Sequence, residues 1–151
     1  MKVIALDSSP RGRKTSKTRL MLDALVKGMR EAGAEVEDIR LREKKIRLCL
    51  GCFTCWTKTP GEFVHKDDMT NELFPKWSEA NIAVYATPLY HYTLNAAMKA
   101  FIERTLPIVE PFMVKRGDRF HHPIRSIPPK RWSCQWPDFP THPFSALLPR
   151  T

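Results

Sequence analysis

Three of the four cysteines stand close together, in the run Cys49-Leu50-Gly51-Cys52-Phe53-Thr54-Cys55. Thiolates at this spacing can turn toward one metal ion or cluster, and without a metal they can carry out thiol redox chemistry. Structural disulfides are less expected, because the N-terminus lacks the features of a secretory signal. His65 or Cys134 could add a fourth ligand. Zinc held by the three cysteines and His65 therefore stays open, but we favour free or redox-active thiols.

A hydroxyl-rich segment, residues 8–18, follows the apolar run Lys2–Leu6 and precedes a helical pattern. The N-terminus of a helix presents unpaired backbone N–H groups, which can bind an anion. Ser9, Ser16 and Thr18 would add hydroxyl donors, and Arg11 or Lys17 would add charge-assisted bonds to phosphate. The segment matches neither GxxxxGK[ST] nor GxGxxG, which disfavours nucleoside triphosphates and Rossmann-type dinucleotides. The alternative is that Ser16 or Thr18 only caps the helix.

A second loop, Thr87-Pro88-Leu89-Tyr90-His91-Tyr92, follows the apolar run Ile82–Ala86. Its Pro-Leu-Tyr sequence offers the apolar surface and backbone groups that a flat aromatic ring such as a flavin needs. The alternative is an ordinary surface turn, and we interpret His91 as a surface residue rather than a proton donor.

Apolar periodicity indicates the elements that would position these loops. Strands are expected at Lys2–Leu6, Val36–Leu41 and Ile82–Ala86, and helices around Leu22–Met29, Met69–Trp77 and Leu94–Arg104. Gly33 would end the first helix, Pro75 weakens the second, and Asp67 or Asp68 could cap it. Strand, helix and strand in this order predict an α/β fold with a parallel sheet. Ligands in such sheets bind beyond the carboxyl ends of the strands, where both loops fall.

The composition favours one compact domain with an anionic partner. The chain has 151 residues, 42% of them hydrophobic, and a formal net charge of +9. The basic residues are scattered apart from one short cluster of Arg40, Arg42, Lys44, Lys45 and Arg47. No aromatic residues are interleaved with this cluster, so we interpret it as a solvated surface rather than a nucleic-acid site. No apolar run reaches bilayer length and no signal peptide is recognised, so we expect a cytoplasmic protein without nucleic-acid or membrane partners.

The end of the sequence differs in character from residues 1–125. Seven of the 13 prolines lie from Pro123 onward, among Trp132, Trp136, Phe139 and Phe144. Prolines recur too often there for a central strand. We therefore expect a domain at 1–125, an irregular tail at 126–151, and an incomplete sheet with three clear strands.

Taken in order, these motifs resemble one known family. Ser-Pro-Arg at 9–11, Ser-Lys-Thr at 16–18, the cysteine run, Asp67-Asp68-Met69, Thr87-Pro88-Leu89-Tyr90 and Met98–Arg104 follow one another. This order resembles the iron–sulfur flavoprotein branch of the NADPH-dependent FMN reductases, which have a flavodoxin-like fold. The resemblance therefore implies a parallel sheet with helices on both faces. The resemblance covers residues 1–125 and stops abruptly there, as truncation or a shifted reading frame would produce.

The resemblance implies a site and a cofactor. Ser9, Arg11, Ser16, Lys17 and Thr18 would hold the FMN phosphate, and Pro88, Leu89 and Tyr90 would line the flavin. Relatives with a 4Fe–4S cluster have a fourth cysteine where this chain has Phe63. We therefore do not expect Cys49, Cys52 and Cys55 to hold a stable cluster.

The implied function is FMN-dependent oxidoreduction with NAD(P)H as electron donor and a small molecule or protein as acceptor. Hydride transfer through a flavin demands no catalytic acid or base, and none is assigned. The resemblance also implies a homodimer or homotetramer. The alternatives are a non-enzymatic flavin- or metal-carrying electron-transfer protein, a truncated inactive homologue, or a basic nucleic-acid-binding protein.

Overall fold

The structure is a computed structural model that describes residues 1–125, so the predictions for Cys134 and for the tail concern residues outside the described part of the chain. In chain order the elements are β1 (Lys2–Asp7), α1 (Lys17–Glu31), β2 (Glu35–Arg40), the 3-10 helix η1 (Leu41–Glu43), the π-helical turn η2 (Met69–Leu73), α2 (Phe74–Glu79), β3 (Ile82–Ala86), α3 (Ala96–Glu103), the 3-10 helix η3 (Leu106–Ile108), β4 (Val114–Arg116) and β5 (Arg119–His121).

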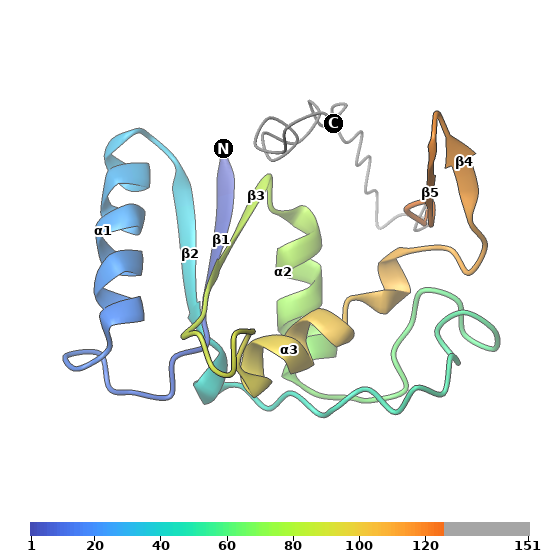
Figure 1. The fold of residues 1–151 in the computed structure, drawn as a ribbon, viewed down its shortest axis with the longest axis horizontal. Coiled ribbons are helices and arrows are strands. Elements are labelled where there is room, and N and C mark those ends of the chain that lie inside the picture. The colour runs from blue at the N-terminus through green and yellow to red at the C-terminus, as the bar shows by residue number, and fades with distance from the viewer. Residues whose placement is uncertain (126–151) are drawn as a thin grey trace, which may run out of the picture.

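The first three strands form a parallel sheet in the order β2-β1-β3. Val3 of β1 lies opposite Val36 on one side and Ile82 on the other. The chain thus crosses to one side of β1 and later returns to the other, which makes the β1–β3 junction a topological switch point. The loops after β1 and β3 leave the sheet at the same edge, the lower one in Figure 1.

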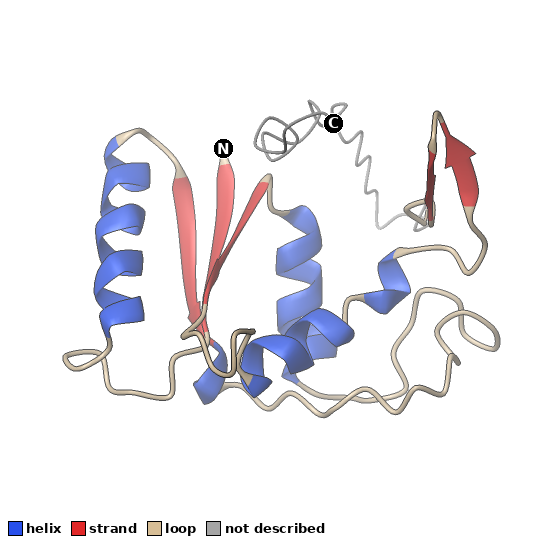
Figure 2. Cartoon of the chain, viewed as in Figure 1, coloured by secondary structure: helices blue, strands red, loops and turns tan. Residues whose placement is uncertain are grey.

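Helices cover both faces of the sheet, as the sequence predicts (Figure 2). Alternate residues of β1 point to opposite faces. Val3 and Ala5 pack with Leu22 and Val26 of α1. Ile4 and Leu6 face the larger core cluster, whose remaining buried members are Ile39, Leu41, Met69, Leu73, Phe74, Met98 and Phe101. The apolar core therefore lies mainly between the sheet and the helices η2, α2 and α3.

The helix ends follow local signals in the sequence. Ser16 caps α1 by accepting a hydrogen bond from Arg19 N. At the other end Gly33 has φ +82°, and Ala34 N donates to Met29 O at 3.0 Å, which is a Schellman motif. Pro75 lies in the first turn of α2, and Leu73 and Phe74 before it keep helical backbone angles, so η2 continues directly into α2. Because proline has no N–H to donate inside this helical stretch, the regular α-helical pattern begins only after the π-helical turn η2.

Several boundaries differ slightly from the sequence-based expectation. β1 runs one residue further, to Asp7, and β2 lies one residue earlier than expected. Helix α3 begins at Ala96 because Asn95 is its N-cap in extended conformation, so Leu94 lies before the helix. The antiparallel hairpin β4–β5 was not expected. Within residues 1–125, β3 is an edge strand of the parallel sheet, and no helix is long and apolar enough to cross a membrane.

Candidate functional site: the loops after β1 and β3

The two loops predicted to bind the cofactor are hydrogen-bonded to each other. Ser8 N donates to Ala86 O at 2.9 Å, which extends the β1–β3 pairing into the loops. Asn95 Nδ2 donates to Ser8 O at 2.6 Å, and Asn95 N donates to Thr87 Oγ1 at 3.3 Å. Asn95 also caps α3 through Met98 N. One buried amide therefore fixes the β1 loop, the β3 loop and the start of α3 together.

Two predicted phosphate residues, Ser9 and Ser16, form a buried chain of hydrogen bonds. Arg19 N donates to Ser16 Oγ at 3.1 Å, and the Ser16 hydroxyl donates to Ser9 Oγ at 2.7 Å. Ser9 Oγ also accepts from Arg11 N at 3.4 Å. Its own proton has no acceptor in the described part of the chain. Donors in such a chain polarise one another, so the Ser9 hydroxyl is a strengthened donor that lacks a partner.

The other residues predicted to bind phosphate lie around this chain of hydrogen bonds. Arg11 and Lys17 are exposed and Thr18 is half-buried at the first turn of α1. Within residues 1–125 the Thr18 hydroxyl has no hydrogen-bond partner, so it is available to a ligand. Basic side chains and free hydroxyls thus gather with the N-terminus of a 15-residue helix, whose partial positive charge favours an anion.

Beneath the loop lies a buried charge network that sequence reasoning did not identify. The guanidinium of Arg19 binds Asp38 and Asp23, and its Nη1 is 3.7 Å from Asp7 Oδ2. The hydrogen bond to Asp38, which outweighs the opposite effect of burial, raises the pKa of Arg19 above its ordinary value. Asp7 Oδ1 accepts from Ser9 N at 2.8 Å, whereas its buried Oδ2 has no hydrogen-bond partner. The network fixes the start of the loop to β1, β2 and α1.

The β3 loop turns sharply after the predicted ring-lining residues. Tyr90 N and O pair with Thr93 O and N at 3.0 and 2.9 Å. Between them His91 has φ +47° and Tyr92 has φ +60°, both in the left-handed region. Side-chain-bearing residues in this region carry strain and cluster at functional sites. Leu89 and Tyr90 are exposed, so the loop presents apolar surface beside the β1 loop.

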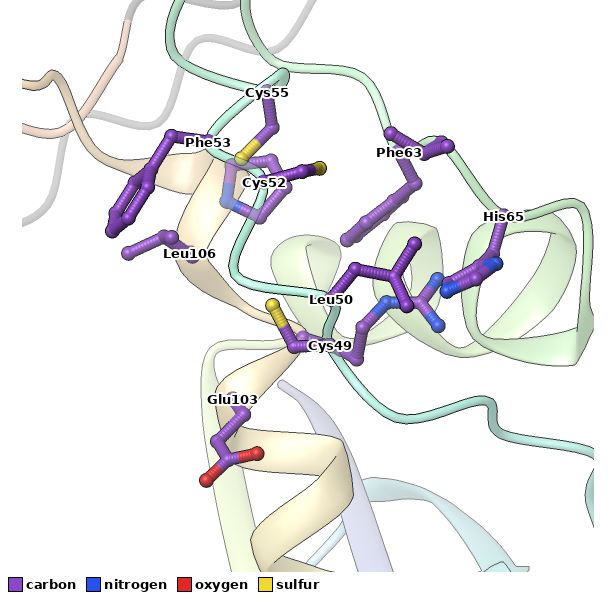
Figure 3. Close-up of a pocket in the computed structure, with 12 residues that line it drawn as sticks. Cys49, Leu50, Cys52, Phe53, Cys55, Phe63, His65, Glu103 and Leu106 are labelled. Carbon is purple, nitrogen blue, oxygen red and sulfur yellow. The ribbon is translucent and has the colours of Figure 1, made fainter.

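The cysteine loop lines a different pocket, shown in Figure 3, to which neither the β1 nor the β3 loop contributes. Cys49, Cys52 and Cys55 lie on one wall, and Phe63 projects toward them from another. Hydrogen bonds from the Thr54 side chain and backbone lower the pKa of the exposed Cys52 thiol. Burial, followed by the charge of Cys49, raises the pKa of Cys55. The neighbouring thiols therefore differ in reactivity.

The donor set at this pocket does not fit an iron–sulfur cluster. Among residues 1–125, no group of three His, Cys, Asp or Glu side chains could hold a metal ion. The Phe63 ring packs edge-on against Phe74 at 4.9 Å between centroids and lies 4.7 Å from the Arg104 guanidinium carbon. His65 Nε2 is 3.2 Å from Leu48 O. Phe63 thus places an apolar ring at the position where the resemblance predicts a fourth cysteine, and His65 is engaged by the backbone.

A buried ion pair holds the segment after this pocket. Arg104 Nη1 and Nη2 donate to the two Asp67 carboxylate oxygens at 2.8 and 3.1 Å. Burial of Asp67 disfavours its charge, but hydrogen bonds from Arg104, Arg47 N and Thr70 N outweigh it and lower its pKa below the ordinary range. Asp67 also accepts from Thr70 N near the start of η2, which fits the capping role expected for Asp67 or Asp68.

Comparison with known proteins identifies the family. Residues 1–121 match the family of NADPH-dependent FMN reductases. An iron–sulfur flavoprotein of Archaeoglobus fulgidus is 41% identical over 107 residues, which are 71% of this chain and 46% of that protein. An iron–sulfur flavoprotein of Methanocaldococcus jannaschii is 30% identical over 115 residues, which are 76% of this chain and 57% of that protein. The chain thus spans about half the length of these relatives.

Solved structures share the fold. The azoreductase AzrA has a TM-score of 0.56 at 16% identity, covering 70% of this chain and 55% of its own. RosB with bound 8-demethyl-8-formylriboflavin-5'-phosphate has a TM-score of 0.57 at 23% identity, covering 69% of this chain and 41% of its own. At such identities the likeness shows a flavodoxin-like fold alone. With the family match over residues 1–121, it establishes that the chain belongs to the NADPH-dependent FMN reductase family of flavoproteins.

Proposed function

We propose that residues 1–125 bind FMN at the β1–β3 switch point and use it as an NAD(P)H-dependent oxidoreductase. The observation that carries the proposal is the Ser9 hydroxyl, which ends the hydrogen-bond chain from Arg19 N through Ser16 and has no acceptor of its own. A phosphate oxygen supplies the missing acceptor. The family match supports FMN as the group that carries this phosphate.

The residues of the β1 loop would contribute to phosphate binding in different ways. Ser9 and Thr18 donate hydroxyl hydrogens, and Ser16 holds Ser9 in place while capping α1. Arg11 and Lys17 are exposed at the same loop and contribute positive charge. Hydrogen bonds to a charged group are each worth about 1.5–3 kcal/mol. The loop can therefore supply most of the discrimination between FMN and riboflavin.

The β3 loop would hold the flavin ring. Pro88, Leu89 and Tyr90 present an apolar surface whose direction is set by the turn at His91 and Tyr92. Bound there, FMN would supply the hydride-accepting chemistry that links NAD(P)H to an electron acceptor. The residues of this chain orient the ring and exclude water from one of its faces.

A second candidate is a flavin carrier without reductase activity. It is favoured by the open outer edge of β3 and by the exposure of Leu89 and Tyr90, because a ring at this place would be covered incompletely by residues 1–125. The two candidates differ in turnover rather than in binding.

Steady-state oxidation of NADH and NADPH by the FMN-loaded chain, with ferricyanide or a quinone as acceptor, separates these functions. The reductase requires turnover above that of free FMN at equal concentration. Flavin absorption without such turnover would reject the reductase function and support the flavin-carrier function. A purified chain that binds no FMN under saturating conditions would refute both.

Exposed apolar side chains on α1 support self-association. Leu20 and Met21 are 70% and 75% exposed, and Leu25 is also exposed. Contact with a second copy would bury them beside the proposed phosphate loop. A homodimer or homotetramer therefore remains part of the proposed function.

A further inference from the structure

The basic cluster, which begins at Arg40 at the end of β2, contacts the candidate phosphate loop directly. Arg42 Nη1 donates to Pro10 O at 2.7 Å, and Arg40 Nη2 donates to Arg11 O at 3.2 Å. Arg40 also binds Glu43 at 2.9 Å, and its Nε lies 3.6 Å from Asp7 Oδ2. Both guanidinium groups are thus engaged by loop carbonyls rather than left as a plain solvated surface.

These contacts determine which way two peptide units face. The Pro10 carbonyl shares a planar trans peptide with Arg11 N–H, and the Arg11 carbonyl shares one with Gly12 N–H. In such a unit the C=O and N–H groups point in opposite directions. Holding the carbonyls toward Arg42 and Arg40 therefore turns both N–H groups away from β2.

The two N–H groups then face the side of the loop where the anion is proposed. Arg11 N–H points to Ser9 Oγ at 3.4 Å, beside the hydroxyl that lacks an acceptor. Gly12 N–H has no partner in the described part of the chain. If the peptides turned over, their carbonyl oxygens would face the phosphate and repel it. The orientation of these units thus decides whether the loop attracts or repels an anion.

We propose that Arg40 and Arg42 are positioning residues that hold the peptide units between Pro10 and Gly12 with their N–H groups toward the FMN phosphate. This inference rests on the proposed FMN site and adds to it residues outside the loop. A solvated surface or a polynucleotide-binding face would need neither guanidinium to contact a loop carbonyl. Arg42 is the better residue to test, because Arg40 also lies against the buried Asp7.

Titration of the full chain with FMN and with riboflavin tests this role, because riboflavin lacks the phosphate. For Arg42→Met we expect FMN affinity to fall about tenfold, equivalent to 1.4 kcal/mol, with riboflavin affinity unchanged within about twofold. Arg42→Lys keeps a charged donor and should retain most of the FMN affinity. Arg47→Met is the matched control, since it removes the same charge from the same segment, and within residues 1–125 only the Arg47 main chain forms hydrogen bonds. It should change FMN affinity by less than about twofold, because exposed charges are screened.

Equal FMN affinities for Arg42→Met and Arg47→Met would overturn the inference while leaving the FMN site intact. So would equal losses of FMN and riboflavin affinity in Arg42→Met, which would indicate general damage to the fold. A wild-type chain that binds neither flavin would overturn the proposed function and this inference with it. Urea unfolding of each variant confirms that the chains compared are folded.

Discussion

Replacing Arg104 by methionine removes one partner of a buried ion pair and should destabilise the protein strongly. The Arg104 and Asp67 side chains are 3% and 0% exposed, and they share two hydrogen bonds. Arg104 also donates to Arg47 O at 2.8 Å and to Thr70 Oγ1 at 3.2 Å. Methionine fills similar space but removes the positive charge that pairs with the buried carboxylate, which keeps the Arg47 and Thr70 N–H groups as donors. Arg47 O and Thr70 Oγ1 also lose the hydrogen bonds that Arg104 donates. Removing one partner of a buried pair costs about 3–5 kcal/mol.

A surface pair on the same helix provides the matched control. Lys99 and Glu103 lie 3.6 Å apart, with side chains 60% and 44% exposed. Pairs of this kind contribute about 0.3–0.5 kcal/mol, so Lys99→Met should be nearly neutral. The two variants should therefore differ by about 2.5 kcal/mol or more. This is a large part of the total stability of a small domain, which is about 5–15 kcal/mol.

Urea unfolding followed by circular dichroism measures the difference. With a slope of about 2 kcal/mol per molar urea, Arg104→Met should lower the midpoint by about 2 M, while Lys99→Met leaves it almost unchanged. Asp67→Asn should cost a similar amount, and the double variant Asp67→Asn/Arg104→Met should cost less than the sum of the two. A midpoint shift for Arg104→Met no larger than that for Lys99→Met would refute the reasoning that this pair holds the segment after the cysteine loop.

Three further predictions concern the same region. Because the pKa of Asp67 is lowered in the folded chain, its contribution to stability is complete above the unfolded pKa of about 3.9 and is lost as pH falls below that value. Urea titrations should therefore show that the stability difference between wild type and Asp67→Asn shrinks from pH 7 to pH 3.5. A difference that grew would contradict the assignment. After brief treatment with iodoacetamide at pH 7.5, mass spectrometry should find Cys52 alkylated before Cys55, because Thr54 stabilises the Cys52 thiolate. Alkylation of Cys55 before Cys52 would be evidence against this account. Anaerobic reconstitution with iron and sulfide should load Phe63→Cys more fully than the wild type, and about four irons per wild-type chain would show that the donor set has been misjudged.

Local sequence patterns were sufficient to predict much of the fold. The apolar run Ile82–Ala86 has the bounds of β3, and Gly33 ends α1 as its position after the periodic residues indicates. The βαβ order was sufficient to place both loops at one edge of the sheet, since parallel strands direct their carboxyl ends together. Ser16 as the cap of α1 was also predictable, because serine before a helical period is a common N-cap.

Contacts between distant residues were harder to foresee. Arg104 and Asp67 are 37 positions apart, and pairing them requires the fold to be known first. Arg19 offered a local signal, because it lies three residues before Leu22 and seven before Val26 and so shares the buried face of α1. Asn95 offered another, as an N-cap residue directly before an apolar run.

Short elements gave too little pattern to be recognised. The strands β4 and β5 have three residues each, which is too few for alternation to show. The turn Gly117-Asp118 between them, with Gly117 at φ +60°, was the available signal. Sequence composition predicts a solvated surface for the basic cluster, because it cannot reveal that the Arg40 and Arg42 side chains contact backbone carbonyls 29 and 32 positions away.

The central claim is that the β1 loop holds the phosphate of FMN, and FMN affinity of the variant Ser9→Ala/Thr18→Ala tests it most directly, because these are the two hydroxyls proposed to donate to the phosphate. Two lost hydrogen bonds to a charged group, at about 1.5–3 kcal/mol each, should weaken FMN binding at least a hundredfold while riboflavin binding is nearly unchanged. Thr15→Ala removes a hydroxyl from the same loop that is engaged with Gly12 O, and it should have little effect. Unchanged FMN affinity in a folded double variant would contradict the account.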